Sequence, residues 1–231
     1  MNNFFYENHN LNKINFKIIN LKKEVERKEF MKLQCDNIGL NYSFFEAIDG
    51  LTYNFKNDID QYYLKNISES TFNTRKGVLA CCISHIQAVK EFVINSNNKN
   101  YMVICEDDVI FTDINTEKII QKIINNSNLN EIGIIYLGLS KLEQPVTEKI
   151  FDIDERYKLY VSDRWMYQGA MAYLITKNVA KQILQRYYMG YCRLPIDHFY
   201  IEQIKNSYIV YPPLIIHNNI GNSSIDKCGG H

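Results

Sequence analysis

Two patterns of apolar and polar residues alternate along the chain. Continuous apolar runs rich in β-branched and aromatic residues predict buried strands; they occupy residues 14–21, 42–48, 101–105, 132–137, 170–175 and 208–216. Runs in which apolar residues recur every three or four positions predict amphipathic helices; they occupy residues 24–39, 74–95, 116–125 and 178–187, with a short further helix opening at Pro195. Strands and helices are therefore expected to alternate along most of the chain.

The fold class that this pattern predicts is α/β. Strands that are apolar throughout are typical of a mostly parallel central sheet whose two faces are covered by helices. Residues 51–73 and 141–158 lack a clear period, so we expect variable loops there. No linker or repeat divides the chain, which predicts a single domain over residues 14–225, between a flexible N-terminal tail at 1–13 and a C-terminal tail at 226–231.

The composition narrows the class of protein. The 231 residues include 26 Lys and Arg against 26 Asp and Glu, so the formal net charge is zero. A partner with many phosphates, such as a nucleic acid or an anionic membrane surface, selects for an excess of basic residues, so both are disfavoured. The six cysteines form no Cys-x-x-Cys pair, which argues against a zinc ribbon or a thioredoxin-like site.

The cellular compartment is predicted from two features of the sequence, its N-terminal residues and the length of its apolar runs. Residues 1–12 are polar and Asn-rich, so they do not resemble a secretory signal. We expect no apolar run to be long enough to span a bilayer. We therefore expect a cytoplasmic protein, either of a low-GC bacterium or, if the gene is viral, of the host-cell cytoplasm; the oligomeric state is not predicted.

An acidic cluster, Glu106-Asp107-Asp108, follows directly on the apolar strand at 101–105. Ligands of open α/β sheets bind beyond the carboxyl ends of the strands, so the cluster is expected in a binding crevice. Adjacent carboxylates repel one another unless a cation or hydrogen-bond donors compensate, and hard oxygen ligands suit Mn²⁺ or Mg²⁺. In extended geometry Glu106 and Asp108 would point the same way and Asp107 the opposite way. A solvated acidic turn is the alternative.

Short blocks along the chain have a recognisable order. They are Ile18–Leu21 with Glu26-Arg27, Phe44–Gly50, Lys76–His85, Val103–Val109, Gly169–Thr176, Leu194–His198 and Pro213–Ile215. In order and spacing this set resembles glycosyltransferase family 25, which includes bacterial lipooligosaccharide galactosyltransferases and collagen galactosyltransferase domains. The likeness covers residues 14 to 225.

The resemblance implies a GT-A type fold, a Rossmann-like domain that binds a nucleotide-sugar donor through a divalent cation, Mn²⁺ or Mg²⁺. In such enzymes the first carboxylate of the acidic motif contacts the donor ribose and the last one binds the metal. Carried onto this chain, Glu106 contacts the donor nucleoside and Asp108 the metal. His217 follows an apolar strand near the C-terminus, where many GT-A enzymes place a histidine that completes the metal shell; a surface histidine is the alternative.

The donor site is expected to include Arg27, Ser84, His85 and Asp107 as well. Arg27 comes soon after the first strand, where a guanidinium can bind a diphosphate in bidentate fashion. A solvated arginine on an amphipathic helix is an equal alternative. His85 has a family position that favours a site role, and a hydrogen-bonded structural histidine is its alternative.

The general base and the acceptor site are assigned to other segments. Asp197, just after Pro195, is the candidate base that removes the proton of the acceptor hydroxyl; an aspartate that only caps a helix is the alternative. Trp165 offers an aromatic face for an acceptor sugar, with Asp163 beside it. Their alternatives are a core tryptophan and a solvated loop carboxylate.

The function expected from these residues is an inverting, metal-dependent transfer of galactose or glucose from a UDP-sugar to a hydroxyl of a glycan or glycoconjugate. A nucleotidyl- or phosphotransferase is a second possibility, because an acidic strand end with Mg²⁺ serves that chemistry equally well. The chain has no Gly-rich G-x-x-x-x-G-K-[ST] loop, which weighs against a P-loop version. A third possibility is a non-catalytic module that binds sugar nucleotides or glycans.

Overall fold

The computed structural model describes residues 14–55, 76–95, 100–126, 132–138, 144–162, 169–191 and 195–218. Within these ranges the strands are β1 (Asn15–Asn20), β2 (Tyr42–Glu46), β3 (Tyr101–Glu106), β4 (Val109–Phe111), β5 (Ile135–Tyr136), β6 (Lys149–Asp152), β7 (Lys158–Val161), β8 (Ala172–Thr176), β9 (Tyr208–Tyr211) and β10 (Ile215–His217). The helices are α1 (Val25–Asn37), α4 (Lys76–Asn95), α5 (Thr116–Ile124), α6 (Lys177–Tyr188) and α7 (Ile196–Gln203).

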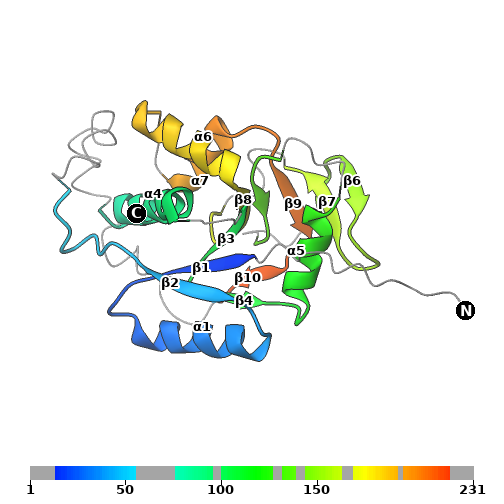
Figure 1. Cartoon of the computed structure of the whole chain (residues 1–231), viewed down its shortest axis with the longest axis horizontal. Coiled ribbons are helices and arrows are strands. Elements are labelled where there is room, and N and C mark those ends of the chain that lie inside the picture. Colours follow the sequence, from blue (N-terminus) through cyan, green and yellow to red (C-terminus); the bar gives the residue numbers. More distant parts are fainter. Residues whose placement is uncertain are drawn as a thin grey trace, which may run out of the picture.

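A large sheet with the strand order β2-β1-β3-β8-β5-β9-β7-β6 forms the centre of the molecule (Figure 1). Strands β2, β1, β3, β5, β9 and β6 run in one direction, and only β8 and β7 are reversed. This confirms the mixed α/β class with a mostly parallel sheet. A second, two-stranded sheet pairs β10 with β4, so that His217 lies opposite Val109.

Both faces of the sheet are buried, and this explains why its strands are apolar at consecutive positions. Helices α4, α6 and α7 lie on one face, and α1 and α5 lie on the other (Figure 1). In β3, Met102 and Ile104 join the core under α4, whereas Val103 and Cys105 join the core on the side of α1. Side chains of successive strand residues point to opposite faces, so a strand covered on both sides needs apolar residues throughout.

Several strands differ from the sequence-based prediction. The run at 132–137 forms only the two-residue strand β5. Strand β6 lies within the segment expected to be a variable loop, β7 begins at the last residue of that segment, and β4 follows the acidic cluster without having been predicted. The edge strand β6 is exposed at both ends, so it carries polar residues and lacks the apolar run that marks the central strands. Residues 56–75, most of the first predicted loop, lie outside the described residues.

Helix α4 is the main core helix. By length and composition alone it is long and apolar enough to cross a membrane, which corrects the expectation that no run reaches that length. In the structure, however, 61% of its most apolar window is buried inside the protein. It packs against α6 and contacts β1, β3 and α7. The apolar residues of α4 are therefore explained by its burial against the sheet and the neighbouring helices.

Candidate active site

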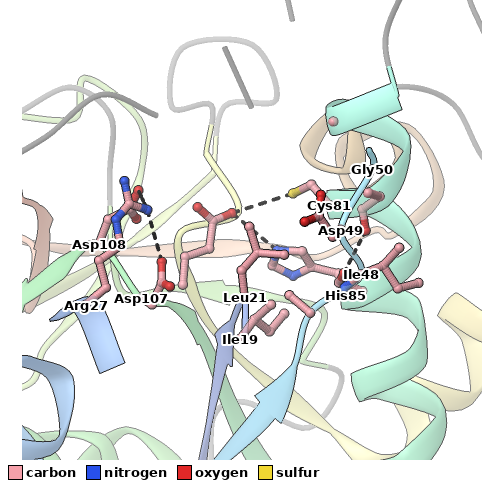
Figure 2. Close-up of a pocket in the computed structure, with 15 residues that line it drawn as sticks. Ile19, Leu21, Arg27, Ile48, Asp49, Gly50, Cys81, His85, Asp107 and Asp108 are labelled. Carbon is pink, nitrogen blue, oxygen red and sulfur yellow. Dashed lines mark hydrogen bonds and ion pairs between the residues drawn. The ribbon is translucent and has the colours of Figure 1, made fainter. Parts of the chain in front are cut away.

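A cleft opens at the carboxyl ends of the three adjacent parallel strands β1, β2 and β3. Its walls come from the ends of these strands, from α1 and from the first half of α4 (Figure 2). It is lined by Ile19, Leu21, Arg27, Ala47, Ile48, Asp49, Gly50, Gly77, Ala80, Cys81, Ser84, His85, Glu106, Asp107 and Asp108. The whole acidic cluster thus lies in the crevice where open α/β sheets bind ligands.

Glu106 is the last residue of β3 and turns towards α4. Its Oε1 lies 3.3 Å from Nε2 of His85 and 3.9 Å from Sγ of Cys81. Burial raises the pKa of Glu106, but the hydrogen bond and charge of His85, helped by the charges of His217 and Arg27, more than offset it, so the pKa lies below its ordinary value. Glu106 is therefore an ionised carboxylate at neutral pH. It can accept hydrogen bonds from the donor groups of a ligand in the cleft.

Asp107 is held by the opposite wall of the cleft. Its Oδ2 accepts a 2.7 Å hydrogen bond from the side-chain amide of Asn20, which is itself buried at the end of β1, and its Oδ1 lies 3.2 Å from Nη1 of Arg27. The guanidinium also lies 3.4 Å from Oδ2 of Asp108. Arg27 is thus not a solvated arginine: it neutralises two carboxylates and lines the cleft (Figure 2).

The side chains of the acidic cluster were expected to point alternately to opposite sides, but the extended backbone that this requires ends at Glu106. Strand β3 ends at Glu106, and the next two residues form a bend. Figure 2 shows Asp107 and Asp108 gathered near Arg27, whereas Cys81 and His85 lie on the other side of the cleft. The cluster is therefore divided into a Glu106 side and an Asp107–Asp108 side, with Arg27 on the latter.

Asp108 and His217 are brought together although 109 positions separate them in the sequence. Nε2 of His217 lies 3.5 Å from Oδ2 of Asp108, and the backbone N–H of Asn218 donates a 2.7 Å hydrogen bond to the carbonyl of Asp108. The pairing of β10 with β4 produces this contact. Burial, together with the charge of Glu106, raises the pKa of Asp108 to about 6.

The donor atoms around Asp108 fit a divalent cation. Its Oδ1 is buried and has no hydrogen-bond partner among the described residues, and such orphaned buried oxygens are rare in folded proteins. The neighbouring imidazole nitrogen is a second ligand atom, and carboxylate and imidazole together suit Mn²⁺. Because burial and Glu106 make the Asp108 charge costly, a cation here would relieve that cost.

His85 belongs to a buried hydrogen-bonded chain. Its Nδ1 lies 2.9 Å from the hydroxyl of Tyr173 on β8, which lies 2.8 Å from the hydroxyl of Tyr200 on α7. All three side chains are fully buried. The hydroxyl of Ser84, also buried, donates to the carbonyl of Ala80 and accepts from the N–H of Ile48, so it ties β2 to α4. A donor contact by Ser84 or His85 stays a prediction.

Asp197 lies in the first turn of α7 and is not among the residues that line the cleft. Its Oδ1 accepts a 2.9 Å hydrogen bond from the N–H of His198, while the N-cap position itself is Pro195. The Asp197 charge contributes to the raised pKa of Cys81 on the cleft wall and of the Tyr136 hydroxyl, in both cases after the larger effect of burial. The carboxylate is therefore within electrostatic range of Cys81, one of the residues that line the cleft.

Two predicted site residues lie outside the described residues, and several residues of the observed site were not predicted. Trp165 and Asp163 lie outside the described residues. Sequence reasoning did not single out Asn20, whose signal is a polar residue ending an apolar strand. It also missed Cys81 as a cleft residue and Tyr173 as a partner of His85, because only the packing of α4 against the sheet brings them together.

Gly50 shapes the cleft at the end of β2, next to the start of α4. A Cβ at this position would lie 2.6 Å from the carbonyl oxygen of Lys76 and 2.8 Å from its carbonyl carbon. We expect Gly50→Ala to lower the free energy of unfolding by about 1–3 kcal/mol, the usual cost of overpacking. Chemical denaturation measures this. Gly39→Asn is the control, because Gly39 has φ +68°, which asparagine tolerates, and no atom lies within 4 Å of its added Cβ. Equal stability of Gly50→Ala and the wild type would contradict the prediction.

Several known proteins are similar to this chain. A candidate glycosyltransferase of Acanthamoeba polyphaga mimivirus is 28% identical over 158 residues, which are 67% of this chain and 47% of that protein. Procollagen galactosyltransferase 1-B of Xenopus laevis is 25% identical over 189 residues, 79% of this chain and 30% of that protein. The chain thus spans less than half of the length of these relatives.

A solved structure and a family model complete the comparison. The crystal structure of a glycosyltransferase involved in the glycosylation of the major capsid of PBCV-1 aligns with 93% of this chain and 96% of its own, at 14% identity and a TM-score of 0.45. The model of glycosyltransferase family 25, described as an LPS biosynthesis protein family, matches residues 13–200, most of the chain and nearly all of the cleft. The chain therefore belongs to glycosyltransferase family 25.

Proposed function

We propose that this chain transfers a hexose, galactose or glucose, from a UDP-sugar to a hydroxyl of a glycan or glycoconjugate, with inversion at the anomeric carbon and with a divalent cation. The observation that carries the proposal is the orphaned, buried Oδ1 of Asp108, which lies beside His217 at the mouth of a cleft in a family 25 fold. Family membership supports a sugar donor and a glycan acceptor.

Asp108 and His217 would hold the cation, Mn²⁺ or Mg²⁺. When bound, such a cation supplies Lewis-acid neutralisation of the diphosphate of the leaving group. Asp108 contributes a carboxylate whose negative charge is otherwise costly in this buried setting. His217 contributes an imidazole that is 43% exposed and thus accessible from solvent. His217 is the last residue of β10 and Asp108 lies in the bend just before β4, so the pairing of these two strands keeps the separation of the ligands fixed.

The donor nucleotide would lie along the acidic edge between the two walls of the cleft. Glu106 accepts hydrogen bonds from the ribose hydroxyls, because its carboxylate is ionised and lies at the end of β3. Arg27 is held against Asp107 and Asp108, so its guanidinium would meet the diphosphate without having to be ordered on binding. Ser84 and His85 line the same wall and contribute mainly by fixing α4.

Asp197 is the proposed general base. It would take the proton of the acceptor hydroxyl as that oxygen attacks the anomeric carbon from the face opposite the departing UDP. Helix α7 is anchored to α4 through the hydroxyls of Tyr200 and Tyr173, so the carboxylate is carried on a fixed element. Trp165 and Asp163 are proposed to contact the acceptor sugar.

A donor panel tests the reaction class. The protein is incubated with UDP-galactose, UDP-glucose and related donors in Mn²⁺, with and without simple acceptors. We expect UDP and free or transferred hexose as products. Release of UMP or diphosphate would instead indicate a nucleotidyl- or phosphotransferase, and saturable UDP-sugar binding without turnover would indicate a binding module.

Glu106→Gln tests the donor contact. A hydrogen bond to a charged group contributes about 1.5–3 kcal/mol, so we expect the KM for the UDP-sugar to rise by about 10- to 100-fold, with a smaller change in kcat. Calorimetry should find a smaller effect on the Mn²⁺ affinity than on donor binding. The control is Glu155→Gln, at an exposed position remote from the cleft lining. An unaltered KM in Glu106→Gln would show that Glu106 does not contact the donor.

A further inference from the structure

Three potential metal ligands from two elements converge on the α4 side of the cleft. Cys81 and His85 are four residues apart, one turn of α4, so their side chains lie on the same face of the helix. Glu106 reaches them from the end of β3. The ligand atoms of all three lie within 4.8 Å of one another. Figure 2 shows Cys81 and His85 side by side on this wall.

The distances match those within a tetrahedral metal centre. Bond lengths of about 2.0 Å to nitrogen and oxygen and about 2.3 Å to sulfur place tetrahedral ligands about 3.3 Å apart for N and O and about 3.6 Å apart for S and O. The corresponding separations here are 3.3 Å between His85 and Glu106 and 3.9 Å between Cys81 and Glu106. The third separation, between the ligand atoms of Cys81 and His85, is at most 4.8 Å, so movement of the Cys81 side chain would complete the fit.

We propose that Cys81, His85 and Glu106 form a binding site for zinc or a zinc-like ion, separate from the pair formed by Asp108 and His217. Thiolate and imidazole are ligands that zinc prefers, whereas a carboxylate with imidazole at a diphosphate site suits manganese. The three ligands leave a fourth position open towards the cleft, because Cys81 and Glu106 both line it.

The ring of His85 is already oriented for this role. A metal-binding histidine characteristically uses its other ring nitrogen in a hydrogen bond that fixes the ring. Nδ1 of His85 lies 2.9 Å from the Tyr173 hydroxyl, which continues to Tyr200. With an ion on Nε2, Nδ1–H donates to Tyr173, whose hydroxyl then donates to Tyr200. Because these side chains are fully buried, the orientation is independent of solvent.

Glu106 belongs both to this site and to the proposed donor site. An ion held by Cys81, His85 and Glu106 occupies the carboxylate that would otherwise contact the donor ribose. Zinc is therefore expected to inhibit by competing with the UDP-sugar. This consequence rests on the proposed function, whereas the binding of the ion does not.

Cobalt(II) is the probe for the site, because a Co²⁺–thiolate bond gives a charge-transfer absorption in the near ultraviolet that carboxylate and imidazole ligands do not give. The reduced protein, freed of metal, is titrated with Co²⁺. We expect this absorption to saturate at one equivalent and to disappear when Zn²⁺ is added. It should persist in Asp108→Ala, be absent in Cys81→Ala and remain in the matched control Cys82→Ala, whose thiol is buried in the core.

Two further measurements keep the inference open to refutation if a variant fails to fold. In the wild type, Zn²⁺ should protect Cys81 selectively from alkylation, as mapped by mass spectrometry. Tyr173→Phe removes the partner of Nδ1 and should weaken Co²⁺ binding by about 10- to 100-fold. Absence of the thiolate band in the wild type, its persistence in Cys81→Ala, or equal alkylation of Cys81 with and without Zn²⁺ would overturn the site.

Addition of UDP separates the two proposals. Displacement of Co²⁺ by UDP, seen as loss of the thiolate band, would support the sharing of Glu106. A thiolate band that UDP leaves unchanged would refute the shared use of Glu106 while the Cys81 site itself stands. A wild type without the band that still turns over UDP-sugar would refute the Cys81 site while the proposed transferase function stands.

Discussion

Asp108→Ala is expected to lower turnover of the UDP-sugar by at least about 10²-fold, and EDTA is expected to do the same to the wild type. The reason is that charge neutralisation by a bound cation contributes several kcal/mol to transition-state stabilisation, and each 1.36 kcal/mol corresponds to a factor of ten in rate. Mn²⁺-dependent binding of UDP, followed by calorimetry, should be lost in parallel. His217→Ala is expected to have a smaller effect in the same direction.

Asp152→Ala is the matched control for the loss of a carboxylate, because Asp152 is exposed and bonds only to Lys149 on the same strand among the contacts of the described residues. It should retain wild-type turnover and UDP binding. Full activity of the wild type in EDTA, or of Asp108→Ala in Mn²⁺, would eliminate the assignment of Asp108 as a metal ligand.

The pH dependence of stability gives an independent test of the buried charge of Asp108. Its pKa is about 6 in the folded protein, above the value of about 4 in an unfolded chain. Between these pH values the folded state holds a proton that the unfolded state has released, so the free energy of unfolding falls as the pH rises. In the metal-free protein, Asp108→Asn should therefore have a higher Tm than the wild type at pH 7 and a similar Tm below pH 4. A lower Tm at pH 7 would show that the carboxylate stabilises the fold.

Asp197→Asn is expected to reduce turnover by about 10²- to 10⁴-fold, the usual contribution of a positioned general base. Asparagine has nearly the size of aspartate and its side-chain oxygen can still accept from the N–H of His198, so the first turn of α7 should be preserved. Only the affinity for a proton is lost. Steady-state kinetics with a saturating acceptor should find kcat reduced and the donor KM little changed.

The outcome also distinguishes Asp197 from a residue that only stabilises its helix. If its sole role is to accept from the backbone of α7, asparagine substitutes for it and neither rate nor stability changes. Near-wild-type turnover of a folded Asp197→Asn protein would thus eliminate the base assignment, and Asp163 would be tested next. Weakened UDP-sugar binding would instead place Asp197 on the hydroxyls of the donor sugar.

The elements that were predicted correctly are those with a strong local signal. Strand β3 and helix α4 lie close to their predicted ranges because continuous apolar burial and helical spacing are visible in consecutive residues. The reversal of β8 between β3 and β5 was not predicted, because an apolar run does not encode strand direction. The short edge strand β6 was not predicted either, because its exposed ends carry polar residues and it therefore lacks a continuous apolar run.

The site was predictable in part for similar reasons. The position of Glu106 at a strand end follows from the sequence, and the family resemblance pointed to Asp108 and His217, which the pairing of β10 with β4 brings together. The role of Asp107 as the partner of Asn20 and Arg27 was not foreseen, because the strand ends one residue before it and its side chain no longer follows the alternation. Such contacts depend on tertiary packing.

The pairing of the last described strand with β4 has a consequence for synthesis on the ribosome. The segment up to Phe111 contains β1, β2, α4 and β3, and with them the carboxylates of the cleft. Tyr173, Tyr200 and His217 are added only as β8, α7 and β10 emerge, the last of them about a hundred residues later. A nascent chain therefore exposes the carboxylate of Asp108 before its partner His217 has been synthesised. We expect the cleft to assemble late and in vectorial order, as the C-terminal strands leave the exit tunnel.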